Sequence, residues 1–241
     1  MADGGVLTDR ASMARAFYRL TATNSSNPAL IEHDGANTLE AVYQFLQYGL
    51  WDAQEFLLDA GLTGRWVTQS SALSFSGSDA SDGGRYAALP ADFMRLAGDQ
   101  YDSALHEPNG TRWGHLIDFK DRRTTSRNCY WLQSTTSNVW RLWITPGSSL
   151  PTTLYADYHH MLATLADSTT VEFPTTHRAL IVAYAADRAM TDAWLPGDPE
   201  MQAKIASNLI KQKQEAQRRV RLSHGPKKIR SRRTGATHWW A

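Results

Sequence analysis

Few residues of this 241-residue chain have the types and the spacing that metal binding requires. His159 and His160 come nearest to a ligand pair. Adjacent residues of a strand point to opposite faces of a sheet, so these two imidazoles cannot easily share one ion. The acidic loop at 79–82 lacks the further oxygen ligands and the closing glutamate of a calcium loop, which favours a solvated turn. We therefore expect no metal site.

The sequence also offers little for catalysis. It contains no HExxH, no GxSxG, no Walker-type glycine loop and no GxGxxG. Its one cysteine, Cys129, excludes an intramolecular disulfide, a Cys-based zinc site and a CxxC redox pair. Three carboxylates could act in catalysis, but no spacing brings two of them together, so a solvated face is the safer interpretation: Asp118, Asp121 and Asp157. We expect no enzyme, no catalytic residues and no cofactor.

Charge is distributed very unevenly along the chain, although the formal net charge is only +1. Residues 211–241 hold ten basic residues and one acidic residue, a net charge of +9. Residues 1–210 hold fifteen basic and twenty-three acidic residues, a net charge of −8. The sequence therefore predicts an acidic body with a basic tail.

The last part of the chain, residues 223–241, combines basic residues with paired tryptophans and has no hydrophobic periodicity, which predicts a flexible arm. One interpretation is a nucleic-acid arm, with phosphate contacts from Lys and Arg and stacking by Trp. Another is a docking arm that follows an acidic partner and buries its tryptophans in pockets. A tail without function is the third, and composition does not separate the first two. The arm residues are Lys227, Lys228, Arg230, Arg232, Arg233, Trp239 and Trp240.

Helical periodicity marks the first sixty residues. A first helix is expected to begin near Thr8 or Asp9, either of which can cap free backbone amides. A second is expected over about 37–60, where Gly61 stands at the position of a left-handed C-terminal residue.

The middle of the chain has the shorter period of strands. Alternation in 64–76 indicates strands, and the glycine-rich and aspartate-rich segment 77–84 indicates a turn or loop. A short helical piece is expected around 92–96. Residues 128–160 are interpreted as an antiparallel meander of three strands.

Helical periodicity returns after Phe173 and Pro174, with Thr175 or Thr176 as the expected cap. A last helix should open at Pro199, because proline suits the first helical position. Helices, then strands, then helices predict an α+β fold with segregated parts.

The fold class is therefore α+β, with a helical bundle body, a β-rich antiparallel insertion and a flexible basic C-terminal arm. The expected parts are N-terminal helices at 1–62, a β-rich insertion with a short helix at 63–172, a helical pair completing the bundle at 173–222, and the arm at 223–241.

A set of short motifs occurs in a characteristic order between about 85 and 220. A tyrosine precedes a Leu-Pro-x-Asp-Phe element, then a Trp-x-x-Pro element follows, and a Phe-Pro pair opens the helical pair. The residues are Tyr86, Leu89, Pro90, Asp92, Phe93, Trp143, Pro146, Phe173 and Pro174. This order resembles the head-to-tail adaptor proteins of tailed bacteriophages, including the tail tubular A-type proteins of short-tailed phages.

The resemblance implies a structural subunit of the virion. Such adaptors form a ring, typically of twelve copies, beneath the portal protein, extend the DNA channel, and present a surface to a tail, nozzle or stopper protein. DNA would pass through the lumen without specific binding, and a C-terminal extension would reach along the portal.

The expected location is the head-tail junction, after synthesis in the cytoplasm of the host bacterium. The first ten residues resemble no secretion signal and no apolar run is long enough to span a bilayer, so no membrane partner is expected. The alternative function is a nucleic-acid-binding protein that uses the basic, Trp-ended arm directly.

Overall fold

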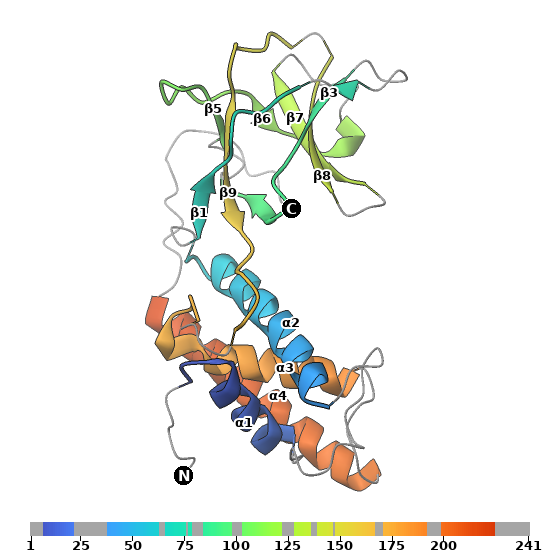
Figure 1. Cartoon of the computed structure of the whole chain (residues 1–241), viewed down its shortest axis with the longest axis vertical. Coiled ribbons are helices and arrows are strands. Elements are labelled where there is room, and N and C mark those ends of the chain that lie inside the picture. The colour runs from blue at the N-terminus through green and yellow to red at the C-terminus, as the bar shows by residue number, and fades with distance from the viewer. Residues whose placement is uncertain are drawn as a thin grey trace, which may run out of the picture. The chain divides into compact units, whose positions relative to one another are not determined.

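The computed structural model describes residues 7–21, 38–62, 66–75, 77–78, 84–97, 103–121, 128–135, 139–146, 148–166, 171–191 and 199–224. They belong to two compact units (Figure 1). The helical unit comprises residues 1–62 and 165–241, and the β unit comprises residues 63–164.

The helical unit is built around one central helix. Its described elements are α1 (Arg10–Thr21), α2 (Thr38–Asp59), the 3-10 helix η3 (Thr175–His177), α3 (Ala179–Thr191) and α4 (Pro199–His224). α3 packs against α1, α2 and α4. It is apolar around most of its circumference, with buried side chains that include Leu180, Ile181 and Val182. A helix of this kind is stable only when neighbours cover it on several sides.

The ends of the first two helices follow from local residue types. Asp9 Oδ1 accepts a hydrogen bond from Ser12 N at 2.7 Å, and Ser12 Oγ accepts one from Asp9 N at 3.2 Å, a reciprocal cap. At the C-terminal end of α2, Gly61 has a φ of 106°. Leu62 N donates to Leu57 O at 3.0 Å, which completes a Schellman motif. The expected boundaries of α2 are confirmed within about a residue at each end.

The start of α3 differs from the expectation. Neither Thr175 nor Thr176 caps it: Pro174 occupies the cap position of η3, with no side-chain hydrogen bond. The chain makes this 3-10 turn first, and α3 begins at Ala179. The predicted threonine cap is therefore wrong.

The last helix begins where proline predicted it and ends later than expected. α4 opens at Pro199, as the sequence indicated. Ser223 and His224, which were expected in the arm, are the last residues of this helix. The periodicity of the apolar residues fades before the helix does, because a helix can continue on polar and basic residues with good helix propensity.

The β unit contains two sheets. The four-stranded sheet centres on β9 (Tyr155–His160), which pairs antiparallel with β1 (Val67–Gln69), β4 (Phe93–Leu96) and β5 (Leu105–His106). The five-stranded sheet has the order β2-β3-β8-β7-β6. Its elements are β2 (Gly77–Ser78), β3 (Arg85–Ala88), β6 (His115–Leu116), β7 (Cys129–Ser134) and β8 (Trp140–Ile144), and the 3-10 helix η2 (Phe119–Asp121) lies between β6 and β7 in sequence.

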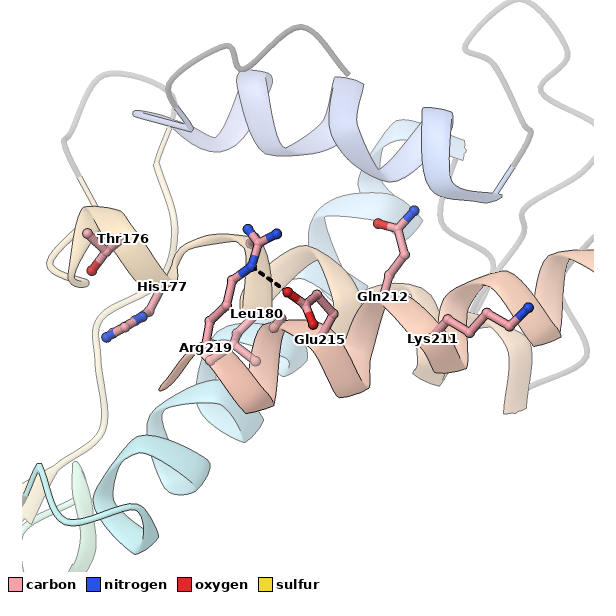
Figure 2. Close-up of a pocket in the computed structure, with 9 residues that line it drawn as sticks. Thr176, His177, Leu180, Lys211, Gln212, Glu215 and Arg219 are labelled. Carbon is pink, nitrogen blue, oxygen red and sulfur yellow. Dashed lines mark hydrogen bonds and ion pairs between the residues drawn. The ribbon is translucent and has the colours of Figure 1, made fainter. Parts of the chain in front are cut away.

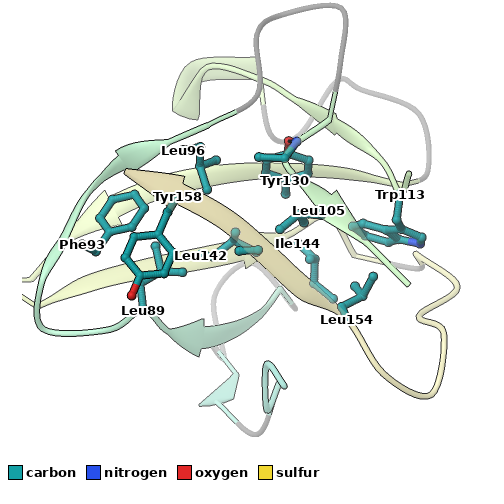
Figure 3. Close-up of a cluster of buried hydrophobic side chains, with 12 residues drawn as sticks. Leu89, Phe93, Leu96, Leu105, Trp113, Tyr130, Leu142, Ile144, Leu154 and Tyr158 are labelled. Atoms are coloured by element: carbon teal, nitrogen blue, oxygen red, sulfur yellow. Dashed lines mark hydrogen bonds between the residues drawn. The ribbon is translucent and has the colours of Figure 1, made fainter. Parts of the chain in front are cut away.

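The core of the β unit draws side chains from both sheets (Figure 3). Leu105 and Tyr158 come from the four-stranded sheet, and Leu142 and Ile144 come from β8 of the five-stranded sheet. All four are at most 5% exposed. Burial of this apolar cluster is what holds the two sheets together.

Three expectations for the β unit are corrected. The segment 92–96 is a strand rather than a helix: a register shift between Phe93 and Arg95 turns both Phe93 and Leu96 inward, and their three-residue spacing imitates a helix. Residues 128–160 contain the three expected strands, and β7 pairs antiparallel with β8 as expected. They form no three-stranded meander, because β8 lies between β7 and β3, and β9 belongs to the other sheet. The insertion is not wholly antiparallel either, since β6 pairs parallel with β7.

The first strands are also shorter than expected. Within 64–76 only Val67–Gln69 forms a strand among the described residues. Gly77 and Ser78, which were expected in a loop, pair with Tyr86 and Arg85 as β2. Their partner strand β3 supplies pairing that local residue types do not reveal.

Gly49 of α2 allows the close approach to α3 and gives the first testable prediction. A Cβ at this position would lie 2.4 Å from Ile181 O and 2.7 Å from Ala185 N. We expect Gly49→Ala to lower the free energy of unfolding by roughly 1 to 3 kcal/mol, because two backbones must separate. Urea denaturation measures this loss. Alanine stabilises an isolated helix by about 1 kcal/mol relative to glycine, so the steric effect must exceed that gain for the variant to be less stable.

Gly110→Ala is the contrasting variant. Gly110 has a φ of +83°, and a Cβ at this position would have no atom within 4 Å, so the substitution should cost only about 1 kcal/mol from backbone strain. A Gly49→Ala protein as stable as the wild type would show that the α2 and α3 backbones are not held in contact.

Candidate interaction sites

The predicted arm residues have no described position. Lys227, Lys228, Arg230, Arg232, Arg233, Trp239 and Trp240 all lie outside the described residues, as does the acidic loop at 79–82. The described part of α4 ends at His224, three residues before Lys227 in the sequence. Interaction sites can therefore be built only from the two units.

The Leu-Pro-x-Asp-Phe element forms a structural corner in the β unit. Leu89 N donates to Trp140 O at 2.9 Å, and Phe93 N donates to Pro90 O at 3.0 Å. Asp92 O accepts from Met161 N at 2.7 Å. The element thus closes the turn from β3 into β4 and ties it to neighbouring segments of both sheets.

Asp92 also binds a buried phenol. Its Oδ1 accepts a hydrogen bond from the Tyr158 hydroxyl at 3.0 Å. Burial, together with the hydrogen bond and charge of Asp92, raises the pKa of Tyr158 to about 12. Phe93 packs beside this phenol, with ring centroids 5.8 Å apart. The aspartate and the phenylalanine of the element therefore serve the core.

A row of stacked groups crosses three strands of the five-stranded sheet. The Arg141 guanidinium lies 4.3 Å above the Tyr86 ring, which lies 4.7 Å from the Trp143 ring. Trp143 stacks on Trp131 at 5.9 Å with an interplanar angle of 9°. These residues alternate along β7 and β8 with core residues such as Leu142, so they occupy the opposite face of the sheet.

This aromatic row accounts for two motif residues, Tyr86 and Trp143. Among the described residues, neither the Trp131 nor the Trp143 indole N–H has a hydrogen-bond acceptor. The aromatic row packs across the sheet, and none of its groups has the chemistry of a reaction centre.

The motif residue Pro146 lies outside this row. It follows β8 at an exposed position.

The Phe-Pro pair, Phe173 and Pro174, lies next to a buried arginine of the helical unit, Arg178. Arg178 is 5% exposed and donates hydrogen bonds to three backbone carbonyls. They are Leu7 O at 2.8 Å, Val171 O at 2.9 Å and Phe173 O at 3.1 Å. One guanidinium thus joins the chain before α1 to the segment that enters α3.

A groove lies beside α4 in the helical unit (Figure 2). Its volume is about 310 Å³. Ala179, Leu180 and Ala216 supply apolar lining, and polar groups come from η3 and from one face of α4. The polar lining residues are Thr176, His177, Lys211, Gln212, Glu215 and Arg219.

Glu215 is the electrostatic centre of the groove. Its carboxylate accepts hydrogen bonds from Arg218 Nε at 2.8 Å and from Arg219 Nε at 3.0 Å (Figure 2 shows the latter). These bonds hold its pKa well below the usual range, at about 2. The groove therefore carries one compensated acid and excess positive charge, which suits binding of an acidic protein surface better than catalysis.

This groove was not among the sites expected from the sequence. The spacing of Glu215 with Arg218 and Arg219 is a detectable signal, because residues three and four apart share a helix face. No sequence pattern indicates that η3 lies across from this face. The groove could not be predicted because the sequence does not show that Thr176 and His177 lie beside α4 in the folded chain.

The three carboxylates that were weighed for catalysis make separate contacts. Asp157 binds His106 Nε2 at 3.1 Å and Arg112 Nη1 at 2.8 Å. Asp118 lies 3.3 Å from Lys120 Nζ at the surface. Asp121 ends η2, where its backbone N–H donates to Asp118 O at 3.0 Å. These contacts hold local structure and do not pair two carboxylates.

The two histidines lie next to each other on β9. His159 pairs with Val67 of β1, and His160 pairs with Phe93 of β4. Across the described part of the chain, no three His, Cys, Asp or Glu side chains are close enough to hold a metal ion. None of the helices described there is long and apolar enough to cross a membrane.

Comparison with known protein families identifies a match. The family model of the SU10 adaptor protein matches residues 75–235. It covers most of the β unit, together with η3, α3 and α4. No curated protein matches the chain.

Arg178 yields a prediction for the helical unit. We expect Arg178→Met to lower the free energy of unfolding by about 3 kcal/mol or more, because three backbone carbonyls, two of them in buried bonds, each lose a charged donor. Arg188→Met is the matched control: its guanidinium pairs with Asp52 at 2.7 Å but is 48% exposed, so its loss should cost less than about 1 kcal/mol. Equal losses in denaturant titrations would contradict a structural role for Arg178.

Tyr158 yields a pH-dependent prediction. Its folded pKa of about 12 lies above the ordinary value of 10.0, so folding favours the neutral phenol. The stability that this adds is present below pH 10 and is lost as the pH rises from 10 to 12. The difference in unfolding free energy between the wild type and Tyr158→Phe should therefore shrink over that interval.

An absorbance titration of the phenolate provides the direct check. The wild-type minus Tyr158→Phe difference should titrate near pH 12, and Asp92→Asn should move it downward because the negative charge is removed. A difference spectrum that titrates at pH 10 would refute the burial of this hydroxyl against Asp92.

Proposed function

Because the chain belongs to the SU10 adaptor protein family, we propose that this phage adaptor protein acts at the head-tail junction. It forms a ring under the portal protein, extends the DNA channel and offers a docking surface to a tail, nozzle or stopper protein. The ring contains twelve copies, and the subunit acts by assembly, without a reaction or a cofactor.

The observation that carries this proposal is the family match over residues 75–235. The match includes every residue of the ordered motifs, from Tyr86 to Pro174. It also includes the basic cluster of the arm, Lys227 to Arg233, and ends before Trp239. The basic cluster thus belongs to the part of the chain that matches the family, whereas the paired tryptophans lie beyond it.

The charge distribution supports separate roles for body and arm. Residues 1–210 carry a net charge of −8, and an acidic channel wall repels DNA and lets it slide. The basic arm follows α4 in the sequence and suits an acidic surface of the portal. In this arrangement the body lines the channel and the arm anchors it.

A second candidate rests on the same basic arm. A net charge of +9 in residues 211–241 would also attract DNA phosphates, and tryptophans can stack on bases. The salt dependence of the binding affinity distinguishes the two functions. Binding to DNA through several phosphates loses orders of magnitude in affinity between low and moderate salt, whereas buried tryptophans are not screened.

The arm gives the test of the proposed function. We expect full-length protein mixed with the purified portal protein of the same phage to form a ring that neither component forms alone, as seen by electron microscopy. Changing Trp239 and Trp240 together to Ala should strongly reduce ring formation at physiological salt, because truncating a buried interface tryptophan costs about 2 kcal/mol or more. Lys227→Ala should change little, since one exposed charge contributes less than about 1 kcal/mol.

A deletion variant and a DNA-binding assay complete the test. Deletion of residues 227–241 should leave the circular dichroism spectrum of the body intact and abolish docking. Tight DNA binding at physiological salt without portal binding would support the second candidate. Portal binding by the truncated protein at wild-type affinity would show that the arm is not the anchor.

A further inference from the structure

The outward side of α4 is wide, basic and partly apolar. Only three of its large apolar side chains are buried among those described: Ile205, Leu209 and Val220. Ile210 is 51% exposed and Leu222 is 66% exposed, although they lie on the same helix. A helix that shows large apolar side chains to solvent beside basic ones has the composition of an interface.

The basic residues of α4 flank these apolar side chains. α4 contains six Lys or Arg and two Glu, a net charge of +4. Ile210, Arg218 and Leu222 follow one another at multiples of four residues, and so form one ridge. Lys204 and Lys211 are exposed beside that ridge, and we refer to these five residues as the α4 outer face.

The outward side of α2 has the opposite charge. α2 contains four acidic residues and no Lys or Arg, a net charge of −4. Glu40, Glu55 and Asp59 are exposed, and Trp51 is half-buried on the same side. Trp51 packs beside Tyr48 with ring centroids 5.9 Å apart. We refer to Glu40, Trp51, Glu55 and Asp59 as the α2 outer face.

These two faces differ in sign and belong to one helical unit. Asp52 of α2 binds Arg188 of α3, and Lys213 of α4 binds Asp187 of α3, so the charges turned toward α3 are compensated inside the unit. The charged side chains of the outer faces are exposed. On α4, Lys204 pairs with Glu200 and Arg218 pairs with Glu215 of the same helix, and the helix still carries a net charge of +4. Two different and complementary surfaces on one subunit permit a head-to-tail contact, which gives a closed ring when the rotation between subunits closes.

We propose that the α4 outer face of one subunit docks on the α2 outer face of a second copy of this chain. This inference rests on the proposed ring and names the surfaces that join its neighbours. The acidic α2 faces the basic α4, the apolar side chains Ile210 and Leu222 lie against the partner's aromatic side chains, and the groove beside α4 lies next to the contact. Opposite charges steer the subunits into this orientation and oppose the reverse one.

Charge-reversed variants test the pairing. The α2 variant is Glu55→Lys with Asp59→Lys, and the α4 variant is Lys204→Glu with Lys211→Glu. In a ring made of only one of these variants, every contact between neighbours brings like charges together. Alternating the two variants restores an opposite-charge pair at every contact, so an equimolar mixture should assemble where each variant alone does not.

The matched control reverses two acids of the β unit, the exposed Asp118 and the partly buried Glu107, as Glu107→Lys with Asp118→Lys. It changes the net charge of the chain as much as the α2 variant does. Thermal unfolding should be nearly the same for all four proteins, because none of the altered side chains lies in a core. A difference in assembly is then not a difference in folding.

Native mass spectrometry of partly filled portals provides the readout. At half-saturation with full-length protein, contacts between neighbours produce portals that are either empty or full, whereas independent docking produces a random distribution. We expect the all-or-none distribution for the wild type, the control and the mixture. The α2 variant and the α4 variant alone should give random occupancy and need at least about tenfold more protein to fill a portal, since a small loss per contact is repeated around the ring.

Each other outcome overturns the inference. All-or-none filling by the separate variants would show that other surfaces join the subunits, and random filling by the wild type would show that no such contact acts, while the proposed function stands in both cases. Equal loss in the β-unit control would assign the effect to total charge. Failure of the wild type to bind the portal would overturn the proposed function and this inference together. Loss of duplex DNA binding by the α4 variant, with its filling unchanged, would assign the α4 outer face to nucleic acid.

Discussion

The close contact of α2 with α3 at Gly49 is the constraint on which the helical unit depends. A side chain there would lie 2.4 Å from Ile181 O, so only glycine lets the two backbones meet. Because α3 is apolar on nearly all sides, it needs this contact as well as cover from α1 and α4. α2 and α4 pack their apolar stripes against α3, and their remaining faces are left to charge.

Arg178 extends this constraint to the path of the chain. Its three carbonyl partners, Leu7, Val171 and Phe173, bring the start of the helical unit to the segment that returns from the β unit. A lysine has no planar set of donors to satisfy three such acceptors. The segment that follows the β unit is also held by Gln47 of α2, whose Oε1 accepts a hydrogen bond from Leu165 N at 2.7 Å. The β unit can thus be an insertion between two helices, since Arg178 and Gln47 fix the segment that leaves it.

Local patterns predicted the elements better than their partners. The α2 helix was predictable because an apolar stripe and Gly61 both act within a few residues, and the Schellman motif at Leu62 followed from them. β4 was mistaken for a helix because its bulge places Phe93 and Leu96 three residues apart on the core side. The partners of β9 were not predictable, because pairing joins it to segments that lie about 50 to 90 residues earlier in the sequence.

The same reasoning explains which interaction residues the sequence revealed. The basic arm was visible because its charges lie close together in the sequence, whereas the groove combines Thr176 and His177 with a face of α4 that lies more than thirty residues away. The opposite charges of α2 and α4 are separated by about 150 residues and cancel in the total of +1. They become a pattern only when the fold turns each helix so that its apolar stripe faces α3, which directs the acids of one and the bases of the other outward. A near-neutral chain can therefore carry two strongly charged, self-complementary faces.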